Sequence, residues 1–141
     1  MARRAAAGDL FALSGDLGAG KSTFARAFIR AAVKDPEAEV PSPTFTLVQT
    51  YSAGEYDIYH ADLYRLESPD DVEDLGLDEE RDEAVLLVEW PDRMPAPWWQ
   101  HALEIKLARE GAVTAAGDEA RRLTFSGDRA RWQKLLEGIV F

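Results

Sequence analysis

The sequence contains no cysteine. It therefore has no disulfide bond, no thiolate nucleophile and no zinc site built on cysteine ligands. Its longest apolar stretches are far shorter than the about 18 residues that a membrane-spanning helix needs, so no segment is predicted to cross a membrane. Near the N-terminus, Asp9 and Asp16 interrupt the alanine-rich stretch before the apolar core of a signal peptide can form. These absences favour a cytoplasmic location.

The chain has 141 residues, of which 46% are hydrophobic and 30% are charged, as is typical of a folded protein. We therefore predict a single domain over residues 1–141. The net charge is −10, and most of the acidic residues lie in residues 35–92. Because an acidic surface repels a phosphate backbone, we expect no DNA partner and no direct grip on nucleic acid. The acidic run at residues 70–83 is either a solvated helix face or a docking surface for a basic partner.

The first half of the chain combines strand and helix patterns. Residues 9–13 form a short apolar run that predicts a buried strand, and residues 21–33 repeat apolar side chains at helical spacing. Residues 46–51 and 56–64 are rich in β-branched and aromatic residues, with a turn at Ala53-Gly54 between them. This order of elements indicates an α/β fold.

In the second half, Ser68 followed by proline and two aspartates has the composition of a helix start. Residues 84–88 are uninterruptedly apolar and predict a strand buried on both faces. Residues 102–107 and 121–125 are expected to pair as a hairpin around a polar loop at 109–120, and residues 129–136 close the chain as a helix. We predict a mixed sheet with a parallel core, more antiparallel toward the end, flanked by helices.

The strongest motif is residues 15–22, GDLGAGKS, which match the P-loop pattern G-x-x-x-x-G-K-[ST]. Glycines let backbone N–H groups turn inward around an anion at the start of the following helix. Lys21 then reaches the β- and γ-phosphate oxygens, and the hydroxyl of Ser22 takes a magnesium position. The alternative is a glycine-rich turn that binds nothing. A strand before the loop and a helix after it favour a nucleoside triphosphate bound with Mg²⁺.

A P-loop also needs an acidic side chain to hold the metal, usually at the end of a buried strand. Glu89 directly follows the apolar run 84–88, where ligands bind in open α/β sheets, although a surface glutamate is the alternative. Asp62 is a second candidate, for binding magnesium through water, orienting an attacking water, or capping a turn. Thr44, after Pro41-Ser42-Pro43, is placed either to sense a γ-phosphate or to form a turn.

The lack of another residue type limits which base the nucleotide can carry. The chain contains no asparagine, so it cannot contain the N-K-x-D motif with which GTPases recognise guanine. ATP is therefore favoured over GTP.

Four segments together resemble the TsaE (YjeE) family of bacterial ATPases: residues 15–24, 40–45, 60–66 and 89–91. Their order and spacing agree across about residues 9–107. The resemblance implies a P-loop NTPase-like fold and an ATPase that assists tRNA N6-threonylcarbamoyladenosine (t6A37) synthesis without transferring the group itself. It also implies docking on the TsaB–TsaD complex, with tRNA contacted only through that complex.

The same resemblance, added to the motif, assigns roles to individual residues. Lys21, Asp62 and Glu89 are the predicted catalytic residues, and Ser22 and Glu89 the predicted magnesium ligands. The predicted nucleotide-binding residues are Gly15, Asp16, Leu17, Gly18, Ala19, Gly20, Lys21, Ser22, Thr23, Thr44 and Trp90. Family members carry a segment before the first strand that covers adenine. Residues 1–4 resemble the end of its helix, so the N-terminal segment is expected to be truncated.

Two other functions remain open. A P-loop small-molecule kinase needs an acceptor pocket and an arginine-bearing lid; Arg121 and Arg122 are instead expected on a solvent-facing hairpin. An interaction module without nucleotide binding conflicts with the intact motif. No arginine is an evident finger, so we predict slow ATP hydrolysis by the chain alone. His60 and His101 lie too far in sequence from ligand-type partners to indicate a metal site or a triad.

Overall fold

The computed structural model describes residues 1–43, 46–113 and 119–137. Its centre is a six-stranded sheet in the order β2-β3-β4-β1-β5-β6. Neighbouring strands among β3, β4, β1 and β5 run parallel, and β2 and β6 add antiparallel edges. The predicted mixed sheet is therefore confirmed. The strands are β1 (Leu10–Ser14), β2 (Val48–Ser52), β3 (Asp57–Asp62), β4 (Ala84–Glu89), β5 (Ala102–Val113) and β6 (Glu119–Ser126).

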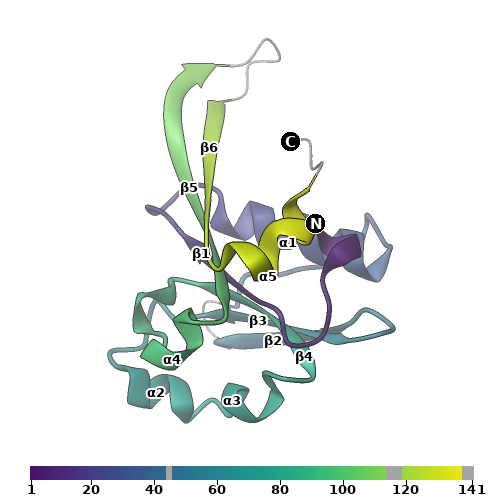
Figure 1. Cartoon of the computed structure of the whole chain (residues 1–141). Coiled ribbons are helices and arrows are strands. Elements are labelled where there is room, and N and C mark those ends of the chain that lie inside the picture. The colour runs from purple at the N-terminus through teal and green to yellow at the C-terminus, as the bar shows by residue number, and fades with distance from the viewer. Residues whose placement is uncertain (44–45, 114–118, 138–141) are drawn as a thin grey trace.

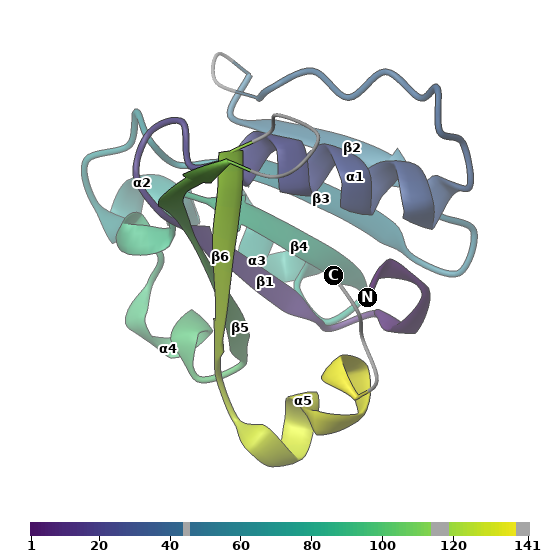
Figure 2. The same cartoon turned by 90° about the horizontal axis from the view of Figure 1, so that it is seen from above.

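Helices cover both faces of this sheet (Figures 1 and 2). One face carries α1 and α5, and the opposite face carries α2, α3 and α4. The α-helices are α1 (Lys21–Val33), α2 (Pro69–Glu73), α3 (Leu77–Glu80), α4 (Ala96–Trp99) and α5 (Arg129–Leu136), with 3-10 turns at Ala2–Arg4 and Pro91–Arg93.

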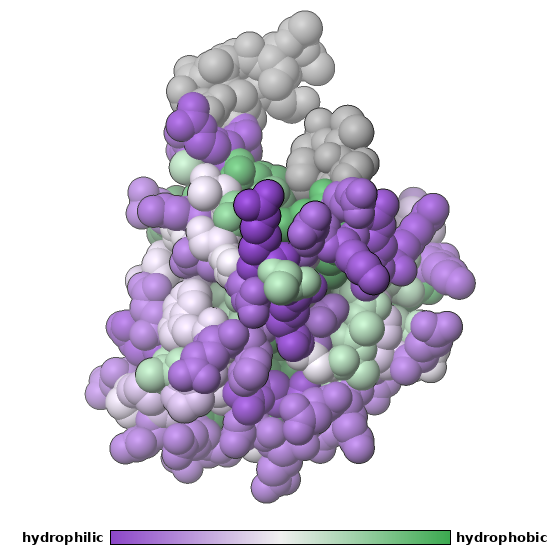
Figure 3. Space-filling view, in the orientation of Figure 1, coloured by the Kyte–Doolittle hydropathy of each residue, from purple (hydrophilic) through white to green (hydrophobic). Residues whose placement is uncertain are grey.

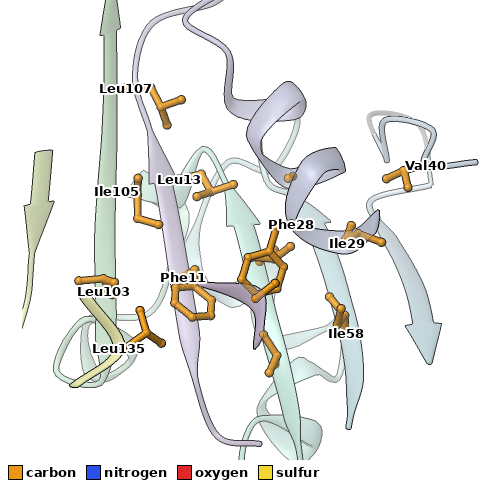
Figure 4. Close-up of a cluster of buried hydrophobic side chains, with 14 of the residues drawn as sticks. Phe11, Leu13, Phe28, Ile29, Val40, Ile58, Leu103, Ile105, Leu107 and Leu135 are labelled. Atoms are coloured by element: carbon orange, nitrogen blue, oxygen red, sulfur yellow. The ribbon is translucent and has the colours of Figure 1, made fainter. Parts of the chain in front are cut away.

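Alternation along the strands divides the apolar side chains into two cores. In β1, Phe11 and Leu13 pack on the α1 side, and Leu10 and Ala12 pack on the α2–α4 side. Figure 4 shows Phe11 and Phe28 of α1 facing each other beside leucines and isoleucines of the sheet. All six residues of β4 are buried, which agrees with the prediction of a strand covered on both faces.

Two helix boundaries follow the local chemistry expected of them. Helix α1 ends where Lys34 adopts a left-handed conformation (φ 60°) and the N–H of Asp35 donates to the carbonyl of Arg30. Helix α2 begins after Ser68, whose N–H donates to Oδ2 of Asp71 at 3.2 Å. This contact is half of a capping box, so the predicted helix start is confirmed.

The hairpin near the C-terminus differs from its prediction. Strand β5 continues to Val113 and β6 begins at Glu119, so most of the predicted loop 109–120 is strand instead. The ladder pairs Arg109 with Arg121 and shifts register between Arg109 and Val113. Figure 1 shows this ribbon projecting from the rest of the molecule. A projecting ribbon has no core face for alternate side chains to meet, so hydrophobic alternation does not mark its full length.

The acidic run 70–83 forms α2, α3 and the turns after them, with most of its carboxylates exposed. Figure 3 shows hydrophilic side chains over this lower part of the molecule. This exposure agrees with a solvated face, and whether the face docks a partner stays a prediction. Among the described residues, no helix combines the length and the apolarity that crossing a membrane requires.

Helix α5 is held to the core by Trp132, which is 2% exposed and lies 5.5 Å from Phe11 between ring centroids. We expect Trp132→Ala to lower the free energy of unfolding by about 3–5 kcal/mol, because it leaves a large cavity. Within the described residues the indole Nε1 has no hydrogen-bond partner. Trp132→Phe loses no hydrogen bond and leaves a smaller cavity, so it should cost clearly less than Trp132→Ala. Urea unfolding measures both, with the exposed Gln133→Ala as a control; equal losses for Ala and Phe would contradict this packing role.

Candidate functional site

The candidate site lies at the carboxyl edge of the central parallel strands. The P-loop, residues 15–22, joins the end of β1 to the start of α1. In the sheet register, Leu13 of β1 pairs with Glu89 of β4, and Glu89 pairs with Asp62 of β3. Because parallel strands end at the same edge, the P-loop and both predicted acidic residues are brought together.

Glycine is required at two P-loop positions. Gly15 has φ +139°, and a Cβ atom there would lie 2.3 Å from the backbone oxygen of Leu107 on β5. Gly18 has φ +80°, and its Cβ would lie 2.6 Å from a guanidinium nitrogen of Arg109. Both positions have a positive φ that side chains rarely adopt, and at Gly15 the backbone oxygen of Leu107 also leaves no room for a side chain. The loop therefore has the bare backbone that a phosphate cradle needs.

Lys21 is the first residue of α1 and only 5% exposed. Its ammonium donates to the carbonyl oxygens of Gly15 at 2.6 Å and Asp16 at 2.9 Å, and lies 4.0 Å from the centre of the Trp90 ring. Burial lowers the Lys21 pKa below its ordinary value, and the negative charges of Glu89 and Asp16 oppose that shift. The cation is thus held inside the loop by neutral carbonyls, an aromatic face and nearby carboxylates.

Glu89 joins two other side chains at the end of β4. The hydroxyl of Ser22 donates to Oε1 of Glu89 at 2.9 Å, and Nε2 of His60 lies 2.5 Å from Oε2. His60 and Glu89 are 1% and 2% exposed, so this pair is fully buried. The separation of His60 from any motif partner in sequence is not kept in space, because its ring contacts Glu89, a predicted magnesium ligand. The period of a strand indicates part of this arrangement, since it places His60 and Asp62 on the same face of β3.

Asp62 and Trp90 complete the neighbourhood of Lys21. Asp62 is 6% exposed, and its Oδ1 accepts the N–H of Tyr64 at 3.0 Å, so it does cap the turn after β3. Trp90 has φ 55°, an uncommon conformation for a residue other than glycine. That backbone turn directly after β4 brings the indole below the Lys21 ammonium, with the Tyr64 ring 5.0 Å away. Strain of this kind is typical of functional sites.

These side chains surround a cavity of about 370 Å³. Gly15, Asp16 and Ala19 line a neighbouring cavity, together with residues of β5. Thr44, the predicted phosphate sensor, lies outside the described residues. Ser42, Tyr64 and Arg121 line the first cavity and were not assigned to the site from sequence. Its lining is Leu17, Gly18, Gly20, Lys21, Ser22, Thr23, Ser42, Asp62, Tyr64, Glu89, Trp90 and Arg121.

The oxygens of Ser22 and Glu89 suit a magnesium ion. In the part of the chain that the structure describes, no three His, Asp or Glu side chains gather as a complete metal site. Magnesium does not need such a cage, because it keeps several waters and binds through one or two protein oxygens plus substrate phosphates. The hydroxyl of Ser22 and the carboxylate of Glu89, already in contact beside the P-loop, therefore fit the ion.

Comparison with known proteins gives consistent matches. A family model described as threonylcarbamoyl adenosine biosynthesis protein TsaE matches residues 1–118. The chain is 40% identical to the tRNA threonylcarbamoyladenosine biosynthesis protein TsaE of Bacillus subtilis, over 94% of this chain and 78% of that protein. Its identity to the protein of the same name from Streptomyces coelicolor is 36%, over 94% and 88%. The match to the Rickettsia conorii protein is 44% identical but spans only 47% of that protein.

A solved structure is also similar. The crystal structure of Bacillus subtilis YdiB superposes with a TM-score of 0.69 at 33% identity, covering 96% of this chain and 79% of that chain.

The His60–Glu89 contact makes a prediction about stability. His60→Phe removes the partner of a buried carboxylate oxygen, so we expect it to lower the free energy of unfolding by about 1–3 kcal/mol. In a cycle with Glu89→Gln, the double variant should lose less than the sum of the single losses. Tyr59→Phe is the matched control, because Tyr59 is next to His60 but faces the other way. Its loss of unfolding free energy should add to that of Glu89→Gln. Additive losses for His60 and Glu89 in urea unfolding would show that the two side chains are not coupled.

Proposed function

The chain belongs to the TsaE family of threonylcarbamoyl adenosine biosynthesis proteins, and from that membership we propose that it binds and hydrolyses Mg-ATP in support of tRNA t6A37 modification. The observation that carries the proposal is the P-loop at the sheet edge, with Lys21, Ser22 and Glu89 converging on one cavity. In this function the chain is an accessory ATPase and does not transfer the threonylcarbamoyl group.

Lys21 and the P-loop backbone bind the phosphates. The ammonium that now donates to the carbonyls of Gly15 and Asp16 exchanges these neutral acceptors for charged phosphate oxygens, which form stronger hydrogen bonds. The positive end of α1, which begins at Lys21, faces the same anion. ATP is the proposed nucleotide because the chain has no asparagine with which to build a guanine-reading N-K-x-D motif.

Ser22 and Glu89 are the proposed magnesium ligands. His60 holds the Glu89 carboxylate in place through its other oxygen, Oε2. Magnesium, when bound, draws negative charge from the phosphate oxygens. Asp62, directly beside Glu89 in the sheet register, is placed to orient water within the same cavity. Trp90 supplies an aromatic face that holds the lysine and excludes water from it.

The TsaB–TsaD complex is the proposed partner, and tRNA is reached only through it. The family name places the protein in threonylcarbamoyl adenosine biosynthesis, while the net charge of −10 disfavours direct binding of a polyanion. Docking completes or orders the site, so hydrolysis by the chain alone is slow. Thr44 is the proposed sensor of the γ-phosphate, in the loop that docking is proposed to order.

ATP hydrolysis by the chain alone, and again after addition of TsaB–TsaD and tRNA, tests the proposal. We expect slow turnover that rises clearly with the partners. Lys21→Ala should lower the hydrolysis rate by about 100- to 1,000-fold, since it removes a donor aimed at developing phosphate charge. Lys134→Ala, on the exposed side of α5, is the matched control and should leave the rate unchanged.

Two outcomes would separate the parts of this proposal. A rate that the partners do not change would contradict the accessory role while leaving the P-loop chemistry intact. Full hydrolysis by Lys21→Ala would contradict the P-loop account itself. Transfer of phosphate from ATP to a small acceptor, in place of hydrolysis, would instead establish a kinase.

A further inference from the structure

The β5–β6 ribbon brings two arginines onto the P-loop. Arg121 of β6 lies opposite Arg109 of β5 in the antiparallel ladder. Nε of Arg121 donates to the carbonyl of Ala19 at 3.1 Å, while Arg109 donates through Nε and Nη2 to the carbonyl of Gly18 at 3.3 and 3.0 Å. Arg121 is exposed, as expected of a residue on a solvent-facing hairpin, but its guanidinium also contacts the P-loop, which the sequence did not indicate. The pairing of two distant strands places it there, and no local pattern marks it.

The two arginines line different cavities beside the loop. Arg121 lines the cavity that also contains Lys21, Ser22 and Glu89. Arg109 lines the neighbouring cavity, together with Gly15 and Asp16. Both side chains hold a P-loop carbonyl, but only the first belongs to the proposed phosphate cavity. This difference separates a role in holding the loop from a role in binding the ligand.

Arg121 lies close to the P-loop backbone. Its Nε is 3.8 Å from the point where a Cβ atom on Gly20 would stand, which is an ordinary van der Waals distance. Arg121 also shares a feature with Lys21, since both cations donate to neutral carbonyls of the same loop. A guanidinium is a planar fork of five N–H donors that matches phosphate geometry. A polyphosphate in this cavity offers each cation a charged acceptor in place of a neutral one.

We propose that Arg121 is a phosphate-binding residue of the nucleotide site, a second cation that the β5–β6 ribbon supplies in addition to Lys21. This inference rests on the proposed function, because it takes the ligand to be a nucleoside triphosphate. Arg121 contacts the phosphates and makes no contribution to recognising the base. The ribbon thereby becomes part of the binding site, although it lies about 100 residues after the P-loop in sequence.

Isothermal titration calorimetry with ATP and with inorganic tripolyphosphate, both with Mg²⁺, tests the assignment. Arg121→Gln removes the charge but keeps an amide donor for the carbonyl of Ala19. We expect it to lower the affinity for both ligands by about 10- to 100-fold, because a charge-assisted hydrogen bond is lost. Arg122→Gln is the matched control, because it changes the net charge equally and Arg122 lies on the opposite face of β6. Its affinity for both ligands should stay within about twofold of that of the unaltered protein. Arg109→Gln should lower the affinity for both ligands clearly less than Arg121→Gln does.

Each other result overturns the proposal. Equal losses of affinity for Arg109→Gln and Arg121→Gln would indicate that both residues only hold the loop in place. A loss for ATP without a loss for tripolyphosphate would place Arg121 against the nucleoside. Unchanged binding of both ligands by Arg121→Gln would remove it from the site. Lys21→Ala is the benchmark: if it binds ATP as the unaltered protein does, the proposed function fails, independently of Arg121.

Discussion

The parallel pairing of β1 with β4 is the constraint on which the site depends. It sets Leu13 beside Glu89, so the strand that leads into the P-loop ends next to the acidic residue that faces Ser22. A slip of one residue would turn Glu89 to the opposite face of the sheet. Every side chain of β4 is buried, and such a slip would exchange the contents of both cores at once. The packing of the core therefore fixes the geometry of the site.

Much of this arrangement could be predicted because its signals are local. The P-loop spacing, the helical period after it and the apolar run ending in Glu89 each lie within a short stretch. Steric demands also act locally, as at Gly15, whose left-handed backbone follows from the loop itself. Once the strands were known to be parallel, the convergence of Glu89 and Asp62 on the P-loop followed from the common direction of the strand ends.

The rest depends on contacts between segments that are distant in sequence. His60 reaches Glu89 because β3 pairs with β4 in a register that sets Asp62 against Glu89. Strand periodicity shows which face His60 occupies, but not which neighbour it meets. Arg121 reaches Ala19 only because β5 pairs with β1 on one side and with β6 on the other. Apolar and polar residues alternate little along β6. The sequence therefore showed neither how far this strand extends nor which way its side chains point.

The charges in the cavity link the proposed metal to the proposed nucleotide. Glu89 and Asp62 are 2% and 6% exposed, so water screens them poorly, and they repel an entering phosphate. These same carboxylates oppose the lowering of the Lys21 pKa that burial causes. Removing them would therefore lower the Lys21 pKa further. Under the proposed function, a divalent ion on Glu89 and Ser22 would resolve this conflict, because it would offset carboxylate charge and leave Lys21 and Arg121 to the phosphates. Under the proposed function, binding of metal and nucleotide is therefore mutually reinforcing, and each raises the affinity for the other by the same factor.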